Sequence, residues 1–543
     1  MSEAESTPVE RRGLGFHLKH NKRLLLTVLA LASPVFTYGY DGIIIGGTLA
    51  APAFVKQFSH GKRLTSTDVS IIVAVPNGGS VIGSLIVAYG GDLLGRRKTL
   101  LVGCLINLIG AAMQTASSDL GLLTAGRVFS NAAAYVFLGM TVTFLNEVAP
   151  ASLRGIIGGL TIFSINVGVV LGSGISLATW DIPNSGAWRL PLGLQLIWPL
   201  LIAIFVFFVR ESPTSYIIKG DDEQALVSLR KIRKGYSEEE LEEEMTSLKL
   251  QDSIRQAEKE VGWIELFRGV NLRRTLLSAF MANVTTLSGV IYASNYATIF
   301  LRQIGSTNPF VLVLGLGLLA FGGSGAGLAL IHLLDRRRLA LSVFSAIFVI
   351  DLVIGVMGCL DTTATYKIKT IAAFSLMYGF FYAAGFGPLV YTSTAEIPNA
   401  RLRNKTAAFT FITNVANSTV CLFVFPYITS DPGNLGAKVY LLFAGCMFLV
   451  IAITWLFFPE VKGRTPAEVD EMFNMKLPAR KFKGTWIGLP LSGSRSFHSL
   501  AGSYGRVLMP VLGYTCAVAP KSIHQQLKDE RHIEQVEVSK TGD

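Results

Sequence analysis

Twelve long apolar runs dominate this 543-residue chain. Each has roughly 18 or more residues, the length that a helix needs to cross a bilayer. Lipid offers no water to unpaired backbone groups, so such runs must fold as helices that satisfy their own hydrogen bonds. Charged residues make up only 16% of the chain, against about 25% in soluble domains. We therefore expect an all-α membrane protein with twelve transmembrane helices, near residues 24–47, 69–89, 98–116, 122–145, 155–178, 190–209, 274–301, 309–333, 338–358, 369–395, 405–428 and 437–458.

A polar insert separates the first six runs from the last six. The predicted organisation is an N-terminal segment, a six-helix bundle, a linker, a second six-helix bundle and a tail, at 1–23, 24–209, 210–272, 273–458 and 459–543. Acidic landmarks recur between the halves. Asp92 corresponds to Asp335 at an offset of 243, and Glu147 and Glu211 correspond to Glu396 and Glu460 at an offset of 249. Two parallel six-helix pseudo-repeats are typical of transporters.

The net charge of +11 reflects topology and does not indicate a nucleic-acid partner. Of the 48 Lys and Arg residues, 39 lie in the termini and the even-numbered connections. Because basic residues accumulate on the cytoplasmic side, both termini are expected there. The five cysteines are too dispersed for a disulfide framework or a metal site. No nucleophile–base constellation, metal spacing or phosphate loop suggests an enzyme.

The order of several short motifs resembles the sugar porter family of the major facilitator superfamily. The matching strings are YGYDGIIIGG, GDLLGRR, NEVAPASLRG, AWRLPLGLQLIWP, RESPTSYIIKG, GFGPLVY, AEIPNARLR, PEVKGRTPAEVDEMF and LPARKF. The last strings look most like fungal maltose and α-glucoside permeases. The resemblance implies the major facilitator fold and secondary active transport by alternating access. It also implies a proton gradient as the energy source, no cofactor, and a monomer in the plasma membrane, with the vacuole or another internal membrane as the alternative.

Two charges lie deep within predicted spans. Asp41 is 17 residues into the first span, about 26 Å from its cytoplasmic end, and Arg127 is about 8 Å below the outer end of the fourth. Intramembrane charges normally pair or line a water-filled cavity. A neighbouring guanidinium would keep the carboxylate ionised, and protonation would release the pair. The resemblance assigns Asp41 and Arg127 to proton coupling; a purely structural ion pair is the alternative.

A second set of charges is expected at the cytoplasmic ends of the helices. We interpret it as a latch of ion pairs that closes when the protein faces outward and separates when it faces inward. Simple topology setting by positive charge is the alternative, and Arg401 is an alternative to Arg403 as a member. The members are Asp92, Arg96, Arg97, Glu147, Arg154, Asp335, Arg336, Glu396 and Arg403.

The positions at which the resemblance implies sugar contacts are poorly matched. Amides of the family fall on Ile162, Thr285, Thr286 and Gly323 here, and lost amides leave sugar hydroxyls unsatisfied. Other polar groups are candidates for binding the solute, although each could equally make a helix–helix hydrogen bond. They are Asn166, Gln195, Thr285, Thr286, Tyr292, Asn295, Tyr296, Tyr391, Asn414 and Asn417.

Three functions follow from these features. The first is a proton-coupled transporter of a sugar or similar polyoxygenated solute. The second is a transporter or exporter of a non-sugar metabolite, such as a fungal secondary metabolite, which fits the lost amides. The third is a nutrient sensor, which the short tail and the retained Asp41 and Arg127 disfavour. Asp351 has no counterpart in the family, and we expect its side chain to extend toward the outer interface.

Overall fold

The computed structural model describes residues 22–59, 64–149, 154–233, 236–296, 298–299, 301, 308–360, 365–430, 432–464, 466–482, 485–486 and 515–516. Within these residues, twelve helices are long and apolar enough to cross a membrane. Each overlaps one of the predicted runs, so the twelve-span prediction is confirmed. The chain up to Trp455 forms one compact unit, and the residues that follow form a second unit.

Six spans come from the first half of the chain, and two of them are interrupted. Span 2 begins with α4 and passes through a π-helical turn, η1, while span 6 consists of α10 and α11. The elements are α2 (Lys22–Ala50), α3 (Pro52–Phe58), α4 (Ser66–Ala74), α5 (Asn77–Leu85), η1 (Ile86–Gly90), α6 (Gly91–Leu93), α7 (Arg96–Ala116), α8 (Leu120–Val148), α9 (Arg154–Thr179), α10 (Gly186–Leu194) and α11 (Ile197–Phe208).

The linker is helical, and the second half of the chain supplies six further spans. The linker holds α12 (Pro213–Ile218), α13 (Asp222–Ile232), α14 (Glu238–Glu260) and η2 (Trp263–Phe267). The spans of the second half comprise α15 (Gly269–Leu287), α16 (Val290–Asn295), α18 (Pro309–Leu333), α19 (Arg336–Cys359), α20 (Thr365–Glu396), η3 (Ala400–Leu402), α21 (Arg403–Thr429), η4 (Gly436–Lys438) and α22 (Val439–Phe457).

The tail has short elements of its own. They are α23 (Pro466–Asn474), η5 (Ala479–Lys481) and two two-residue strands, β1 (Thr485–Trp486) and β2 (Thr515–Cys516), which pair in parallel. Phe473 of α23 packs its ring against Phe482 at 5.2 Å.

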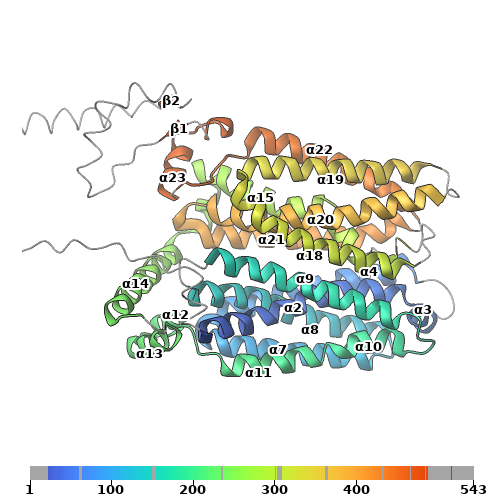
Figure 1. The fold of residues 1–543 in the computed structure, drawn as a ribbon, viewed down its shortest axis with the longest axis horizontal. Coiled ribbons are helices and arrows are strands. Elements are labelled where there is room, and N and C mark those ends of the chain that lie inside the picture. The colour runs from blue at the N-terminus through green and yellow to red at the C-terminus, as the bar shows by residue number, and fades with distance from the viewer. Residues whose placement is uncertain are drawn as a thin grey trace, which may run out of the picture. The chain divides into compact units, whose positions relative to one another are not determined.

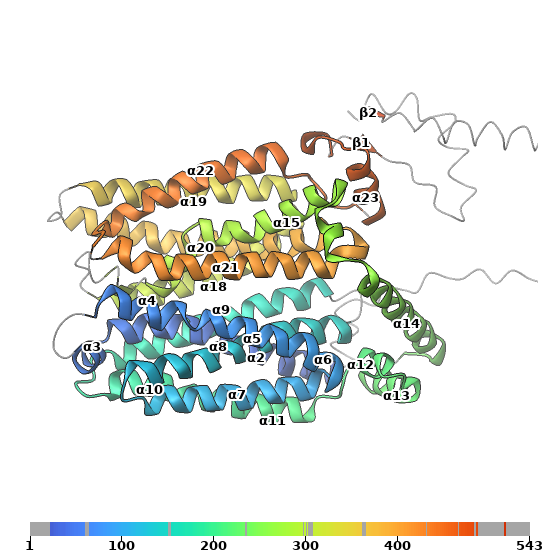
Figure 2. The same ribbon diagram turned by 180° about the vertical axis from the view of Figure 1, so that it is seen from behind.

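The spans lie side by side, and the linker helices α12, α13 and α14 gather at one end of them (Figures 1 and 2). We call this the linker end, and the opposite end, where α3 lies, the far end. Close helix packing depends on glycine. A Cβ on Gly39 of α2 would lie 2.0 Å from the Ile165 carbonyl oxygen of α9, and one on Gly168 would lie 2.1 Å from the Phe36 oxygen. Only glycine permits so close an approach of two backbones.

Within the described residues, the two halves meet mainly through α9 with α18 and α4 with α21, and α2 also contacts α16 and α5 contacts α21. Span 7 breaks near the far end, between α15 and α16. Gly289 at the break has φ +81°, a left-handed conformation that glycine adopts at little cost. The ring of Phe443 lies against it, where a Cβ would come within 2.6 Å.

Candidate functional site

The first candidate site is a buried polar network within the N-terminal half. Asp41 on α2 is 6% exposed, and its Oδ1 accepts a 2.8 Å hydrogen bond from Nε2 of Gln195, which ends α10. Arg127 on α8 places Nη1 4.0 Å from the same oxygen. Its Nε donates to the Ile72 carbonyl at 3.2 Å, while Nη1 has no hydrogen-bond partner within the described residues. The glutamine is therefore the close partner of Asp41, and the arginine is a looser one.

Gln195 is held in the orientation that lets it donate to Asp41. Its Oε1 accepts from Gln114 Nε2 at 3.3 Å, and the same nitrogen donates to Ser130 at 2.7 Å. Nearby, the Tyr40 hydroxyl donates to the Pro191 carbonyl at 2.9 Å. Hydrogen bonds to a charged group are roughly twice as strong as neutral ones, so the strength of the bond from Gln195 depends on the charge of Asp41. Protonation of Asp41 would weaken its bonds to both α8 and α10.

Asp41 and Arg127 lie close together, as the resemblance implies. Solute contact by Gln195 stays a prediction, and in this structure its amide donates to Asp41. Gln114 was not predicted at all. The signal available was a burial pattern: a polar side chain on an apolar span without an obvious partner must find one inside the protein.

The second candidate site is an ion-pair cluster at the linker end. Arg96 begins α7, is 2% exposed, and donates from Nη2 and Nε to Glu147 at 2.8 and 3.1 Å. Its Nη1 donates to the Gly91 carbonyl at 2.7 Å and lies 3.6 Å from Asp92. Glu211 receives the backbone N–H groups of Arg96 and Arg97 at 2.9 and 3.2 Å, which caps the first turn of α7.

The second half repeats this arrangement. Arg336 begins α19, donates from Nη1 to the Ile331 carbonyl at 2.5 Å, and pairs with Glu396 at 3.2 Å. Each arginine thus binds the carbonyl five residues before it and a glutamate at the end of a later helix. Arg96 and Arg336 are 240 positions apart, whereas Asp92 and Asp335 are 243 positions apart. The two aspartates therefore lie at different distances before the first residues of α7 and α19. Asp335, which directly precedes α19, pairs with Arg338 at 3.5 Å.

The linker adds a charge that sequence reasoning missed. Arg255 of α14 donates to both oxygens of Asp92 at 2.6 and 2.7 Å, and α14 also contacts η3 in the second half. The spacing of charges in this helix gives no indication of the partner. The linker therefore contacts both halves of the chain at this end.

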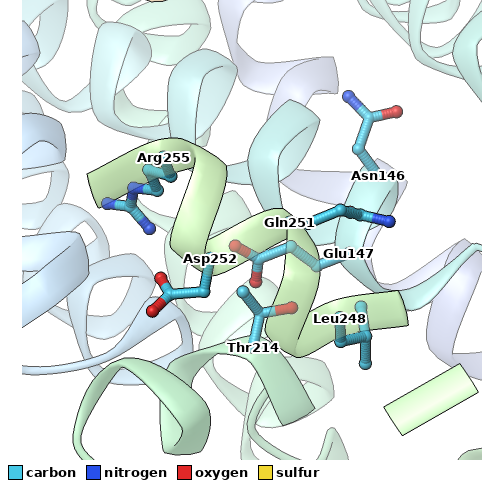
Figure 3. Close-up of a pocket in the computed structure, with 7 residues that line it drawn as sticks. All are labelled: Asn146, Glu147, Thr214, Leu248, Gln251, Asp252 and Arg255. Carbon is cyan, nitrogen blue, oxygen red and sulfur yellow. The ribbon is translucent and has the colours of Figure 1, made fainter. Parts of the chain in front are cut away.

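Two cavities lie beside the cluster. The larger has a volume of about 500 Å³ and is lined by Asp92, Arg96, Glu147 and Arg255 together with Arg401, Asn404 and Lys405 of the second half. The smaller, of about 310 Å³, lies between the end of α8, α12 and α14. Figure 3 shows its lining residues Leu248, Gln251, Asp252 and Arg255 on α14, near Glu147 and Thr214. A cavity lined by residues of both halves therefore lies at the linker end.

Two predicted latch residues lie differently, and a third has its side chain outside the described residues. Arg97 turns its side chain to the Phe207 carbonyl at 2.7 Å and its guanidinium over the Phe207 ring. Arg403 begins α21, and its Nε has no hydrogen-bond partner within the described residues. The side chain of Arg154 lies outside the described residues. Arg401, the alternative to Arg403, lines the larger cavity.

The far end is closed by hydrogen bonds between the halves. Asn77 donates from Nδ2 to the hydroxyls of Ser418 and Thr419, each at 3.0 Å. The Ser70 hydroxyl donates to the Phe423 carbonyl at 2.8 Å, and Tyr427 donates to Thr67 at 3.0 Å. The two halves are therefore joined directly by hydrogen bonds at the far end and have a cavity between them at the linker end.

The predicted solute-binding amides already have partners in this state. Asn417 donates to Asn283 at 3.0 Å, and Asn414 donates to the Ala282 carbonyl at 2.9 Å and to Thr285 at 3.3 Å. The other two amides bond within their own helices, Asn166 to the Ile162 carbonyl and Asn295 to the Ile291 carbonyl, each at 3.1 Å.

The remaining candidates are buried or lie outside the description. Thr286, Tyr292 and Tyr296 are 2%, 2% and 4% exposed. The Tyr296 hydroxyl donates to the Leu422 carbonyl at 2.8 Å, and the two tyrosine rings lie 5.8 Å apart. The side chain of Tyr391 is outside the described residues. Solute contact by these groups stays a prediction.

Apolar side chains occupy the contact between the halves where sugar porters are expected to carry amides. The rings of Phe163 on α9 and Phe321 on α18 approach to 4.4 Å. Ile162 lies opposite Gly387 on α20, where a Cβ would be 3.6 Å from its side chain. At Ile162, a carbon side chain therefore stands where the resemblance implies an amide.

Comparisons with known proteins agree with the fold and with the motifs. The model of the family described as "Sugar (and other) transporter" matches residues 25–473. The major facilitator-type transporter ecdD of Aspergillus rugulosus is 30% identical over 80% of this chain and 84% of its own length. The general alpha-glucoside permease of Saccharomyces cerevisiae is 28% identical over 89% of this chain and 80% of its own length.

Among solved structures, the proton:xylose symporter XylE, from E. coli, superposes with a TM-score of 0.69 at 18% identity, covering 84% of this chain and 100% of that chain. This similarity shows the fold. The chain belongs to the sugar transporter family of the major facilitator superfamily. Its family and fold are those of transporters, and it is an integral multi-pass membrane protein.

Proposed function

We propose that the protein is a proton-coupled secondary transporter that carries a sugar or a similar small polyoxygenated solute by alternating access. The observation that carries the proposal is Asp41, a buried carboxylate held by Gln195 at 2.8 Å with Arg127 at 4.0 Å. A proton that binds there removes the charge which both partners stabilise. The helices that carry the partners, α8 and α10, are then free to shift relative to α2.

The linker end is the cytoplasmic end in this proposal, so both termini are cytoplasmic and the structure faces inward. The basic residues support this orientation, because 39 of 48 lie on that side. The latch residues support it as well, since Arg96 and Arg336 each pair with a glutamate of their own half. The cavity beside Arg96 lies between the halves. The outward-facing state would close this cavity and separate Asn77 from Ser418 and Thr419.

The proton gradient is the energy source in this proposal, and no cofactor takes part. The transporter works as a monomer in the lipid bilayer of the plasma membrane, with the solute and the proton as its partners. The name of the XylE relative includes proton symport, which supports coupling. The name of the yeast relative includes α-glucosides, which supports a sugar.

The proposal is tested by uptake in a cell that lacks its own sugar transporters. Labelled glucose, maltose and xylose are offered with and without an inward proton gradient, and cells carrying Asp41→Asn serve as the control. Accumulation that needs both the gradient and Asp41 supports the proposal. If the proton gradient leaves uptake unchanged, the proposed proton coupling is refuted.

A second candidate cargo is a non-sugar metabolite, moved inward or outward. The apolar contacts of Phe163 with Phe321 and of Ile162 with Gly387 favour it, because a sugar would find few donors there. If none of the three sugars accumulates while everted vesicles take up a less polar oxygenated metabolite, the proposed substrate is a non-sugar metabolite and not a sugar. The nutrient sensor would bind solute without moving it.

A further inference from the structure

Asp351 is a carboxylate in the middle of α19 and has no role in the proposed transport mechanism. At 1.5 Å per residue it lies about 22 Å from the first residue of the helix and about 12 Å from the last. Its side chain is 0% exposed, so the expectation that it extends toward the outer interface is wrong. Neither carboxylate oxygen has a hydrogen-bond partner within the described residues.

The groups around Asp351 include no cation that reaches it within the described residues. Tyr378 of α20 and Tyr440 and Cys446 of α22 are close enough to sense its charge, and Tyr382 stacks on Tyr378. The charged groups on the surrounding elements are engaged elsewhere or face outward. Lys367 donates to the Leu360 carbonyl at 2.5 Å, and Lys369 and Lys438 are exposed. The one titratable residue of α18 is His332, and its side chain lies outside the described residues.

An ionised carboxylate in this position would be costly. It would be buried without a counter-ion or a hydrogen-bond donor among the described residues, and burying such a charge is strongly unfavourable. A neutral carboxyl group avoids most of that penalty. We propose that Asp351 is a second proton-binding site of this transporter, in the C-terminal half and separate from Asp41.

The surroundings connect this site to the break in span 7. The Tyr378 hydroxyl donates to the carbonyl of Ser288 at 2.8 Å, directly before Gly289. Tyr440 packs its ring 5.8 Å from that of Tyr292 on α16. If the break rearranges, Tyr378 loses its acceptor, and its hydroxyl can turn to stabilise an ionised Asp351. Proton occupancy at Asp351 therefore follows the conformation of span 7, a link that rests on the proposed transport cycle.

The proton site itself is tested by infrared difference spectroscopy of the purified full-length protein in lipid, without any solute. Wild type should show a protonated-carboxyl band at neutral pH that is lost in Asp351→Asn and in Asp351→Leu. Asp252→Asn is the matched control, because Asp252 accepts a 2.8 Å hydrogen bond from Gln256 and should leave that band intact. The leucine variant guards against misfolding, since it fills the site without a polar group.

Two results would overturn the proton site. One is a band that Asp351→Asn and Asp351→Leu leave unchanged. The other is a band that appears only when Na⁺ is removed, which would make Asp351 a cation ligand. Neither result depends on transport, so failure of the proposed function leaves this test intact.

The link to span 7 is tested by exchange of the transported solute in an Asp41→Asn background. The single variant should retain a pH-dependent exchange rate, and the double variant with Asp351→Asn should lose that dependence. Identical pH profiles for the two variants would overturn the link. Absence of exchange by the wild type for every solute offered would count against the proposed function instead.

Discussion

Replacing Gln195 by methionine should move the pH dependence of transport to higher pH. The side chain is 4% exposed and donates to Asp41 at 2.8 Å, and methionine nearly keeps its shape while removing the donor. A hydrogen bond to a charged group contributes about 1.5–3 kcal/mol. Since about 1.4 kcal/mol corresponds to one pH unit, the midpoint should rise by about 1–2 units. The sign follows because the ionised form alone loses stabilisation, so the proton is held to a higher pH.

The assay is the initial rate of solute uptake into proteoliposomes over a series of pH values. Gln256→Met is the matched control, because Gln256 also donates to an aspartate at 2.8 Å but in the linker helix α14. Its midpoint should equal that of the wild type. A midpoint that stays constant or falls in Gln195→Met would refute the assignment of Asp41 as the coupling carboxylate held by Gln195.

Three further changes have defined outcomes. Arg96→Ala leaves Glu147 without its arginine partner and should destabilise the protein by about 3–5 kcal/mol in thermal unfolding. The control Arg230→Ala breaks the exposed pair with Glu238 and should cost about 0–1 kcal/mol. Equal losses would contradict the larger contribution of the buried pair. Asn77→Ala removes two hydrogen bonds between the halves, worth about 1–3 kcal/mol together, and should raise the labelling rate of a cysteine at Ser70 by an impermeant thiol reagent. Gly168→Ala should prevent close packing of α2 on α9 and lower the melting temperature, while Gly174→Ala, with its nearest neighbour at 4.0 Å, should be tolerated.

The fold was largely predictable because its determinants are local. Apolar run length alone locates the twelve spans, since lipid leaves the backbone no alternative to a helix. The ends of the helices were less predictable. Helix α20 runs over Thr365–Glu396, four residues before and one residue after its predicted run of 369–395. The break at Gly289 packs against the ring of Phe443, which lies far along the chain.

The site was predictable only in part, because its contacts are long-range. The pairing of Asp41 with Arg127 followed from the rule that buried charges find partners. Arg96 and Glu147 were expected only as members of one charge cluster, and the structure shows that they pair. The bond of Gln195 to Asp41 and that of Arg255 to Asp92 join residues 154 and 163 positions apart, and no local pattern marks them. The isolation of Asp351 could not be predicted either. It depends on which side chains the described residues of α18, α20 and α22 place around the carboxylate.

The central claim is that Asp41 carries the proton that drives accumulation. Asp41→Asn keeps the shape of the side chain and mimics its protonated form, so the variant should fold and should still exchange labelled solute across a liposome membrane. It should fail to accumulate that solute when an inward proton gradient is imposed. Accumulation by Asp41→Asn to the wild-type level under the same gradient would contradict the account.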